Sequence, residues 1–321
     1  MYFSEDTIDD LMLPVLQELL RRPCDIQSRR GKSSEILGAM LHLQNPRARI
    51  SRSETRGKPF SALGELMWYL SKDKSLEFIS YYIKQYDGES SDGKTVYGGY
   101  GPRIFKLRDE INQFKNITDL LTEHQSSRKA VIQIFDGIDL VDEHPEIPCT
   151  CTLQFLIRDN RLNMFTTMRS NDAFLGLPHD IFTFTMLQEI IARQLNVDMG
   201  IYTHAVGSLH LYEGDQVNAQ KYIEEGYHST KDVMPDMPFG DPWPALKILS
   251  EEEIKIRNGE SINEMDLQID DYWIDLIRLL KVYSSLRENN LQGVETLKSE
   301  MKSSVYNIYL DQKIKHIKLK L

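Results

Sequence analysis

The chain has 321 residues, of which 41% are hydrophobic and 27% are charged, and its net charge is −10. This length and apolar content suffice for one large domain with an appendage. A nucleic-acid partner is not expected, because duplex binders usually carry a basic excess. No apolar stretch approaches the roughly 20 residues that a membrane-spanning helix needs, and the acidic N-terminus differs from a basic secretory signal. We therefore expect a cytoplasmic protein with no membrane partner.

The pattern of apolar residues in the first hundred positions predicts two helices, one strand and one loop. Residues 7–20 have apolar side chains near helical spacing. A basic, small-residue stretch at 28–34 precedes a strand-like run at 36–43. Residues 61–70 again read as a helix, and the segment 87–101, with five glycines, reads as a loop.

The middle of the chain predicts strands around one long helix. Residues 130–135 and 152–157 alternate or run apolar like strands, and 162–168 completes a hairpin with the second of them. Residues 182–195 read as a helix, and 204–212 returns to strand. The order indicates an α+β protein with a mixed β-sheet packed by helices.

After about residue 249 the composition changes. An acidic run is followed by a helix at 273–283, and the chain ends in a lysine-dotted segment. We therefore expect a catalytic domain over 1–249 and a helical extension over 250–321. Packing on the core is the simplest role for this extension, and covering a dimer surface or a site mouth is the alternative.

Three cysteines, at positions 24, 149 and 151, do not form a disulfide framework. Cys149 and Cys151 form a C-x-C pair, but no second Cys or His cluster completes a zinc site, so no metal is expected.

Four short segments carry residues with chemical potential. Each also has an ordinary explanation when it stands alone: a buried cysteine, a surface ion pair, a helix N-cap and a packed core pair. The segments are Pro148-Cys149-Thr150, Met168-Arg169-Ser170-Asn171-Asp172, Leu175-Gly176-Leu177-Pro178-His179-Asp180 and Gly207-Ser208-Leu209-His210-Leu211-Tyr212.

Together, these segments resemble the thymidylate synthase family. The order P-C, Q-F, R-S-x-D, L-G-x-P and G-x-x-H-x-Y agrees in spacing over 148–212. Weaker similarity lies upstream at Glu65-Leu66-Met67-Trp68-Tyr69, Tyr100-Gly101 and Ser127-Arg128-Lys129. The resemblance covers about residues 10–249 and implies the family's α+β fold.

The resemblance implies a nucleophile and its proton-transfer partners. Cys149 would add to C6 of a pyrimidine, so that C5 can attack 5,10-methylenetetrahydrofolate as co-substrate. A nearby arginine such as Arg169 would lower the pKa of the thiol. Glu65 and Tyr100 would manage water and removal of the C5 proton.

The resemblance also implies binding residues. Arg169 and Ser170 would hold the 5′-phosphate together with Arg29 or Arg30, and His210 and Tyr212 would bind the sugar hydroxyl. The folate would face Asp172, Leu175 and Gly176. In the family's homodimer, Arg128 and Lys129 would reach into the site of the other subunit.

One departure from the family pattern bears on the base. Asp180 stands where a thymidylate synthase has Asn. A carboxyl group can accept from the N4 amino group of cytosine and, if protonated, donate to N3. Alternatively, it stays ionised and N3 takes up a proton as Cys149 adds. Thr150 and Ser208 also depart from the family's usual His and Asp. These departures agree with the cytidylate hydroxymethylase branch, whose stretches Q-x-L-I-R-D, M-R-S-N-D and V-G-S-L-H-x-Y match 154–159, 168–172 and 206–212.

The sequence thus predicts a hydroxymethyltransferase acting on CMP or dCMP, with Asp180 at the base. Water, rather than a hydride, would complete the reaction, since the loop 87–101 holds no shielding tryptophan. The alternatives are a thymidylate synthase, a cytidylate C5-methyltransferase and a non-catalytic nucleotide-binding protein. The sequence does not separate ribose from deoxyribose.

Overall fold

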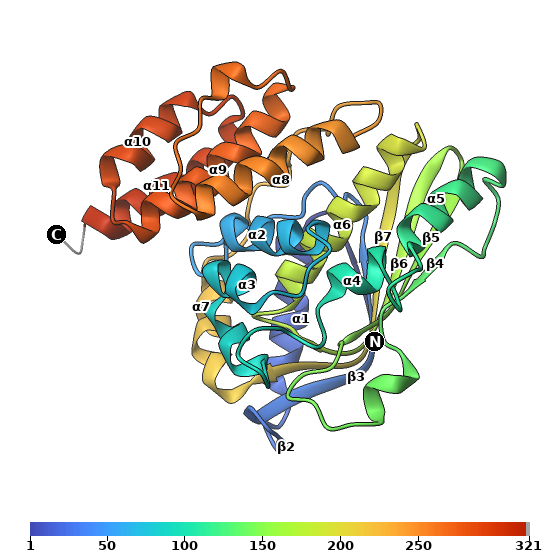
Figure 1. Cartoon of the computed structure of the whole chain (residues 1–321). Helices are drawn as coiled ribbons and strands as arrows, with labels where there is room; N and C mark the ends of the chain where they lie inside the picture. The colour runs from blue at the N-terminus through green and yellow to red at the C-terminus, as the bar shows by residue number, and fades with distance from the viewer. Residues whose placement is uncertain (319–321) are drawn as a thin grey trace.

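The computed structural model describes residues 1–318 (Figure 1). The strands are β1 (Tyr2–Glu5), β2 (Ile26–Ser28), β3 (Gly31–Leu43), β4 (Val131–Gln133), β5 (Thr150–Arg158), β6 (Arg161–Asp172) and β7 (Asp198–Tyr212). The helices are α1 (Ile8–Arg21), α2 (Pro59–Leu70), α3 (Leu76–Tyr82), α4 (Tyr100–Phe105), α5 (Gln113–Glu123), α6 (Leu177–Gln194), α7 (Gln216–Glu224), α8 (Trp243–Arg257), α9 (Asp271–Arg287), α10 (Leu291–Glu300) and α11 (Asn307–Lys318). A short 3₁₀ helix, η1, spans Lys84–Glu89.

The strands form one mixed sheet in the order β1-β3-β7-β6-β5-β4, and β2 adds to β3 as a hairpin. β3 and β7 are antiparallel, β7 and β6 are parallel, and β6 and β5 are antiparallel. The predicted α+β class with a mixed sheet and packed helices is therefore confirmed.

The helices lie in successive layers on one face of this sheet. α1 and α6 contact the strands directly, α2 packs on α6, and α9 packs on α2 (Figure 1). Because α6 is covered on both sides, most of its residues are buried. The opposite face of the sheet is only partly covered within this chain, and half-buried residues such as Leu156 and Phe165 lie along it.

The tight turn between β5 and β6 is correctly predicted. Asp159 and Asn160 have φ values of 50° and 55° there. Asn and Asp tolerate this left-handed conformation, and a two-residue loop of this kind matches the twist of a hairpin.

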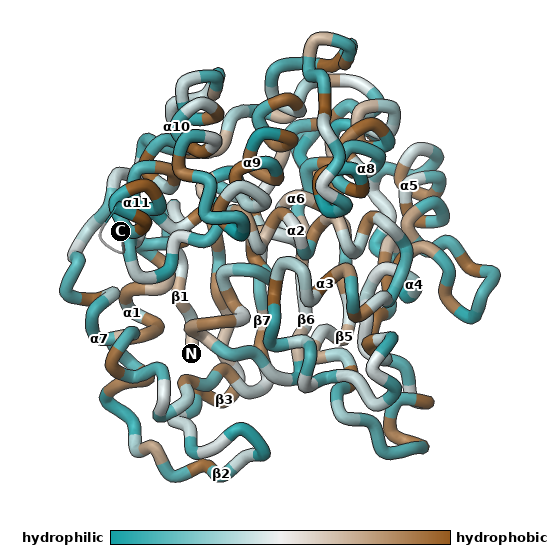
Figure 2. The backbone as a smooth tube through the Cα atoms, turned by 60° about the vertical axis from the view of Figure 1, so that its left-hand side comes forward, coloured by the Kyte–Doolittle hydropathy of each residue, from teal (hydrophilic) through white to brown (hydrophobic). Residues whose placement is uncertain are grey.

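Several predicted boundaries move outward in the structure. The helix expected at 182–195 begins at Leu177, because Pro178 suits the first turn of a helix. The strand expected at 204–212 begins at Asp198. The basic stretch at 28–34 is not a separate segment but the tip of the β2–β3 hairpin, which is coloured hydrophilic and projects from the body in Figure 2.

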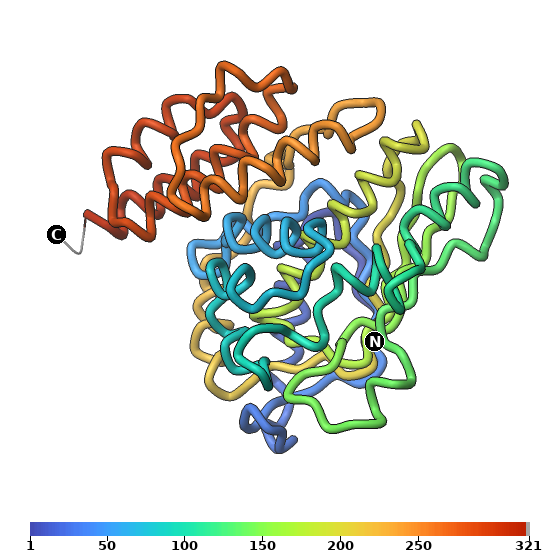
Figure 3. The backbone as a smooth tube through the Cα atoms, in the orientation of Figure 1, coloured from blue at the N-terminus to red at the C-terminus, as the bar shows by residue number. Residues whose placement is uncertain are grey.

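The C-terminal helices form a bundle beside the sheet domain (Figure 3). α8 runs through residue 249, so the expected division at 249/250 falls inside a helix rather than in a linker. α9 contacts α8, α10 and α2, which joins the bundle to the core. Of the lysine-rich end at 313–321, residues 319–321 lie outside the described residues. Among residues 1–318, the structure contains no helix of the length and apolarity needed to cross a bilayer.

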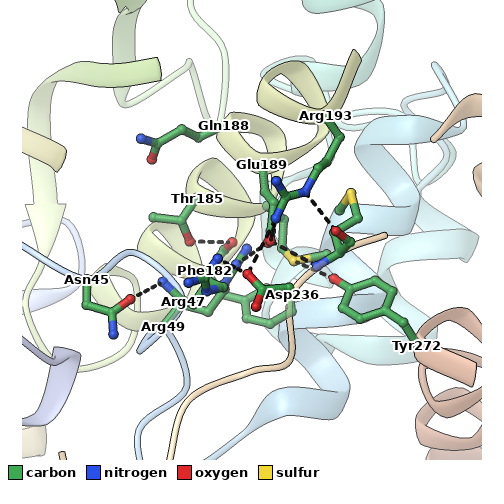
Figure 4. Close-up of polar contacts among 12 residues, drawn as sticks. Asn45, Arg47, Arg49, Phe182, Thr185, Gln188, Glu189, Arg193, Asp236 and Tyr272 are labelled. Atoms are coloured by element: carbon green, nitrogen blue, oxygen red, sulfur yellow. Dashed lines mark hydrogen bonds and ion pairs between the residues drawn. The ribbon is translucent and has the colours of Figure 1, made fainter. Parts of the chain in front are cut away.

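A buried ionic network fixes the far end of α6 (Figure 4). Glu189 pairs with Arg49 and accepts a hydrogen bond from the backbone N–H of Met237 at 3.1 Å. Arg193 donates to the carbonyl of Met237 at 2.7 Å and pairs with Asp236. The helix whose first turn carries Asp180 is therefore anchored at its other end, where an unpaired buried charge would be costly.

Candidate active site

A cavity of about 1470 Å³ opens between the sheet domain and the C-terminal bundle. Thirteen of the predicted site residues line it: Arg29, Arg30, Glu65, Tyr100, Cys149, Arg169, Ser170, Asp172, Leu175, Gly176, Asp180, His210 and Tyr212. Arg128 and Lys129 do not. They are exposed between α5 and β4, where the carbonyl of Arg128 accepts from Gln154 at 2.9 Å.

Cys149 lies immediately before β5, and its position is set by the neighbouring strand β6. The backbone N–H of Arg169 donates to the carbonyl of Cys149 at 2.8 Å. The guanidinium of Arg169 donates to the carbonyls of Pro148 and Ile147, each at 3.0 Å. The thiol therefore sits at the end of a strand, facing the cavity, on a segment held by one arginine.

The expected low thiol pKa is not found. Arg169 does lower the pKa of Cys149, but burial and the charge of Glu146 outweigh it and raise that pKa to about 12. The sequence-based expectation considered the arginine and not the carboxylate beside the sulfur. In this state the thiol is protonated at neutral pH.

Around Cys149, three arginines are held by two carboxylates, and we call these residues the thiol cluster: Cys149, Glu146, Glu89, Arg29, Arg30 and Arg169. Glu89 lies 3.1 Å from Arg29 and also pairs with Arg30. Glu146 lies 3.7 Å from Arg29 and 3.9 Å from Arg169. Three guanidinium groups at one place can bind a phosphate dianion through charge-assisted hydrogen bonds.

Asp180 is the last member of a directed chain of hydrogen bonds. Burial lowers the pKa of His204 to about 3, so its ring is neutral. Tyr202 Oη then donates to His204 Nδ1 at 2.7 Å, and His204 Nε2 donates to Asn171 Oδ1 at 3.0 Å. Asn171 Nδ2 in turn donates to Asp180 Oδ2 at 2.8 Å. Asp180 is not an N-cap, because Gly176 occupies that position.

The environment of Asp180 favours the neutral form of its carboxyl group. Burial, with the charge of Glu65 as the next cause, raises its pKa well above the ordinary value. Since Asn171 donates to Oδ2, the other oxygen carries the proton. Asp180 thus offers the cavity one hydrogen-bond donor and one acceptor.

Glu65 lies among tyrosines on the same wall. It accepts from Tyr86 Oη at 2.6 Å and from Tyr69 Oη at 3.5 Å. Burial raises the pKa of Glu65 to about 7, which suits a group that exchanges protons near neutral pH. Tyr100 Oη accepts from the backbone N–H of Thr150 at 3.2 Å, which places it beside the segment that carries Cys149.

Two further cations, Arg56 and Lys58, line the cavity beside Ser61 and His179. We call these four residues the Arg56 cluster. Arg56 donates to the backbone carbonyls of Phe174 and Leu175 and lies 3.0 Å from His179 Nδ1. Burial lowers the pKa of His179 well below its ordinary value, so Nδ1 accepts from Arg56 while Nε2 donates to Ser61 at 2.9 Å. This cluster holds the turn 172–180 in shape.

Asp172 organises the same turn and leaves one oxygen free. Its Oδ1 accepts from the backbone N–H groups of Phe174 and Leu175 at 2.8 and 2.9 Å. Its Oδ2 is buried and has no hydrogen-bond partner within residues 1–318. A buried acceptor without a partner on a cavity wall is suited to a ligand N–H group.

His210 and Tyr212 share one face of β7, as predicted. Their rings meet edge to face with centroids 4.9 Å apart. The parallel pairing of β6 with β7 sets Ser170 opposite Ser208 and Asp172 opposite His210, which brings the two motifs together at one end of the sheet.

The C-terminal bundle forms part of the cavity wall, so its role exceeds packing on the core. Tyr283 Oη donates to the carbonyls of Tyr81 and Tyr82 at 2.9 and 3.0 Å. Beyond this contact, Leu286, Arg287, Asn289, Lys313, His316 and Ile317 line the cavity.

Sequence reasoning missed Glu89, Glu146, Arg56, His179 and the bundle residues. Glu146 stands three positions before Cys149, and a carboxylate so close to a candidate nucleophile is a signal that could have found it. Arg56 and His179 gave no comparable signal, because their partners come from segments more than a hundred residues away.

Comparison with known proteins agrees with this geometry. Residues 37–275 match the family described as thymidylate synthase. A deoxyuridylate hydroxymethyltransferase of Pseudomonas phage M6 is 31% identical over 166 residues, which cover 50% of this chain and 46% of that protein. A deoxyuridylate hydroxymethyltransferase of Delftia phage PhiW-14 is 27% identical over 210 residues, covering 60% and 57% respectively. The chain therefore spans about half the length of the curated relatives it matches. The match over 37–275 includes the thiol, the Asp180 chain and the Arg56 cluster, and the chain belongs to the thymidylate synthase family.

Proposed function

We propose that this protein is a pyrimidine nucleotide 5-hydroxymethyltransferase that uses 5,10-methylenetetrahydrofolate, with cytidylate as its preferred substrate. The observation that carries the choice of base is the buried carboxyl group of Asp180, which accepts from Asn171 and stands where an amide would be expected in a thymidylate synthase. Family membership supports the one-carbon chemistry, and the named activity of the two phage relatives supports the hydroxymethyl product.

The nucleotide lies against the thiol cluster in this proposal. Arg29, Arg30 and Arg169 bind the 5′-phosphate with the hydroxyl of Ser170, and His210 and Tyr212 bind the sugar. Cys149 then adds to C6 of the ring, forming a carbon–sulfur bond and making C5 nucleophilic.

Asp180 reads the base through its donor and its acceptor. The protonated oxygen donates to N3 of cytosine, and Oδ2 accepts from the N4 amino group while it also accepts from Asn171. Burying a mismatched pair costs on the order of 1–3 kcal/mol for each unsatisfied group. The fixed chain from Tyr202 to Asn171 keeps Oδ2 an acceptor and so sets the polarity of this pair.

The tyrosine-bound Glu65 handles the C5 proton. Its pKa of about 7 lets it accept a proton and return it during one turnover at neutral pH. Tyr86 and Tyr69 hold the carboxyl group in place on the cavity wall.

The residues present fit a folate co-substrate, which supplies the one-carbon unit. Asp172 offers its unpartnered Oδ2 to a ring N–H group, and the turn at Leu175 and Gly176 forms the adjacent wall. Of the three tryptophans, only Trp68 lines the cavity. With a single indole ring on its wall, the cavity can admit the water that adds to the one-carbon unit.

Deoxyuridylate is the second candidate substrate, because both phage relatives are named for it. A neutral carboxyl group has one donor and one acceptor, so it can also face the O4 acceptor and N3–H donor of uracil. The choice between the bases depends on which oxygen of Asp180 meets ring position 3.

We propose that the working form is a homodimer. The half-covered sheet face, with Leu156 and Phe165, offers an apolar surface for a second copy. Arg128 and Lys129 are exposed and lie away from the cavity of their own chain, as residues that serve the other subunit would.

The test is to incubate the protein with 5,10-methylenetetrahydrofolate and CMP, dCMP or dUMP in separate reactions. The nucleotide and folate products are then identified by mass spectrometry. Gain of one CH2O on a cytidylate, with tetrahydrofolate left behind, is the expected result. Gain of CH2 with formation of dihydrofolate would instead establish methyl transfer, and turnover of dUMP alone would contradict the choice of base.

Asp180→Asn sharpens this test. An amide restores the pairing for uracil, so the preference should move toward dUMP by on the order of 10- to 100-fold in kcat/KM. Asp198→Asn, at the exposed start of β7, is the matched control and should leave the preference unchanged.

A further inference from the structure

Glu146 lies against the nucleophile on a segment that the arginines hold rigidly. Its Oε1 is 3.7 Å from Cys149 Sγ, in the position of an acceptor for the thiol proton. The carbonyl of Pro145 accepts from Arg29, and the carbonyls of Ile147 and Pro148 accept from Arg169. The backbone on both sides of Glu146 is therefore held in place, and its side chain lies within reach of the sulfur.

The same carboxylate competes for the cations that would bind phosphate. Arg29 and Arg169 lie 3.7 and 3.9 Å from its two oxygens. The groups that face Glu146 from neighbouring elements are Arg29 and Arg30 of the β2–β3 turn, Glu89 of η1, Arg169 of β6 and the thiol of Cys149. In this arrangement Glu89 and Glu146 occupy the place of an anionic ligand.

We propose that Glu146 is the proton acceptor for Cys149, and that the arrival of the nucleotide phosphate switches it on. A phosphate dianion binds Arg29 and Arg169 more strongly than a carboxylate does, so Glu146 loses its cations and gains an anionic neighbour. Both changes increase its affinity for a proton. The S–H bond of Cys149 then breaks, an O–H bond forms on Glu146, and the sulfur electron pair becomes available to bond to C6.

The electrostatics of the cluster agree with this sequence of events. Burial and the charge of Glu146 raise the pKa of Cys149 to about 12, so the thiol needs a nearby acceptor before it can attack. Burial and the adjacent Glu89 raise the pKa of Glu146 to about 7, while Arg30 and Arg169 oppose this rise. A phosphate bound to these arginines neutralises their charge and so weakens that opposition.

The first experiment uses a Cys151→Ser background, because Cys149 and Cys151 share one peptide. It measures alkylation of Cys149 by iodoacetamide, read by mass on that peptide, with and without inorganic phosphate. The inference rests on the proposed function for the identity of the phosphate-bearing ligand, but this assay requires no turnover. In wild type, phosphate should accelerate alkylation severalfold. In Glu146→Gln, alkylation without phosphate should be on the order of tenfold faster than in wild type, because a negative charge beside the thiol is lost, and phosphate should no longer accelerate it.

The second experiment measures turnover of the nucleotide that wild type accepts. Glu146→Gln should lower kcat on the order of 100-fold, although its free thiol is more reactive. Opposite changes in thiol reactivity and turnover are not expected from a purely structural residue. Glu146→Asp retains the carboxyl group and should recover part of kcat. Glu123→Gln, exposed on α5 and outside the cavity, should match wild type in both assays.

The inference is overturned if phosphate accelerates alkylation equally in wild type and Glu146→Gln, or if that variant keeps full kcat. Failure of the proposed function looks different. In that case no pyrimidine nucleotide is converted, yet the phosphate response of Cys149 still depends on Glu146.

Discussion

The thiol cluster and the Arg56 cluster place cations on the wall of one cavity but hold them in different ways. In the thiol cluster, the side chains of Arg29, Arg30 and Arg169 are 58%, 49% and 39% exposed, and carboxylates are among their partners. Arg56 is 2% exposed and is held by two backbone carbonyls and a neutral histidine. Carboxylate partners can be exchanged for a phosphate, whereas backbone carbonyls cannot leave without unfolding the turn. In the proposed function the exposed arginines bind the phosphate, whereas the buried one holds the turn.

The largest effect should come from the reacting atom itself. Cys149→Ser removes the thiol and should lower kcat by on the order of 10⁴-fold or more, with unfolding unchanged, because the hydroxyl is a far weaker nucleophile. Steady-state kinetics together with a denaturant melt make the measurement. The neighbouring Cys151→Ser, which does not line the cavity, is the control. Residual turnover near that of wild type would mean that the chemistry does not pass through Cys149.

Breaking the Arg56 cluster should reduce stability rather than affinity. Arg56→Met leaves the carbonyls of Phe174 and Leu175 and the Nδ1 of His179 without their donor, at a cost of about 3 kcal/mol in the free energy of unfolding. Urea denaturation measures this cost, and the exposed Lys58→Met should change it by less than about 0.5 kcal/mol. An equally small cost for Arg56→Met would mean that the buried contacts of Arg56 do not hold the turn.

The contribution of Glu65 to stability should depend on pH. Its pKa is raised to about 7 in the folded protein by burial, from an ordinary value of 4.5, so folding takes up a proton. The stability contributed by the neutral carboxyl group is fully present below about pH 4.5 and is lost as the pH rises through about 7. Glu65→Gln does not titrate, so its stability relative to wild type should rise by about 2–3 kcal/mol between pH 4.5 and 8.

Denaturant unfolding at the two pH values makes this measurement. The exposed Glu77→Gln should show no such gain. A stability difference between Glu65→Gln and wild type that is equal at both pH values would mean that folding does not raise the pKa of Glu65.

The residues that the sequence revealed are those carried by short contiguous motifs. Cys149 directly precedes β5, Arg169 lies within β6 and Asp180 lies in the first turn of α6, where local pattern decides position. Glu146 and Arg56 were missed because their roles come from contacts with other segments. For the same reason the thiol pKa was wrong in sign: the arginine was visible in a motif, while the opposing carboxylate and the burial of the sulfur depend on the folded chain.

The C-terminal bundle shows that sequence-based prediction has the same limit for the fold. Its helical character followed from composition, and α9 lies where a helix was expected. Its place on the cavity wall could not be predicted, because it depends on contacts of Tyr283 with carbonyl groups two hundred residues away. The division at residue 249 was likewise chosen from composition, which does not reveal that α8 continues across it.

The smallest expected effect comes from a change in the thiol cluster. Arg169→Lys keeps the charge but cannot make the paired contacts of a guanidinium, so the Kd of the nucleotide should rise by on the order of 10- to 100-fold. Stability should change little, since this side chain is partly exposed. Calorimetric titration with the accepted nucleotide measures the Kd, and Arg108→Lys, which pairs with Asp136 outside the cavity, is the control. If Arg169→Lys instead destabilised the fold as much as Arg56→Met while binding persisted, Arg169 would act mainly through the carbonyls of Ile147 and Pro148. The thiol cluster would then have a structural role, like the Arg56 cluster.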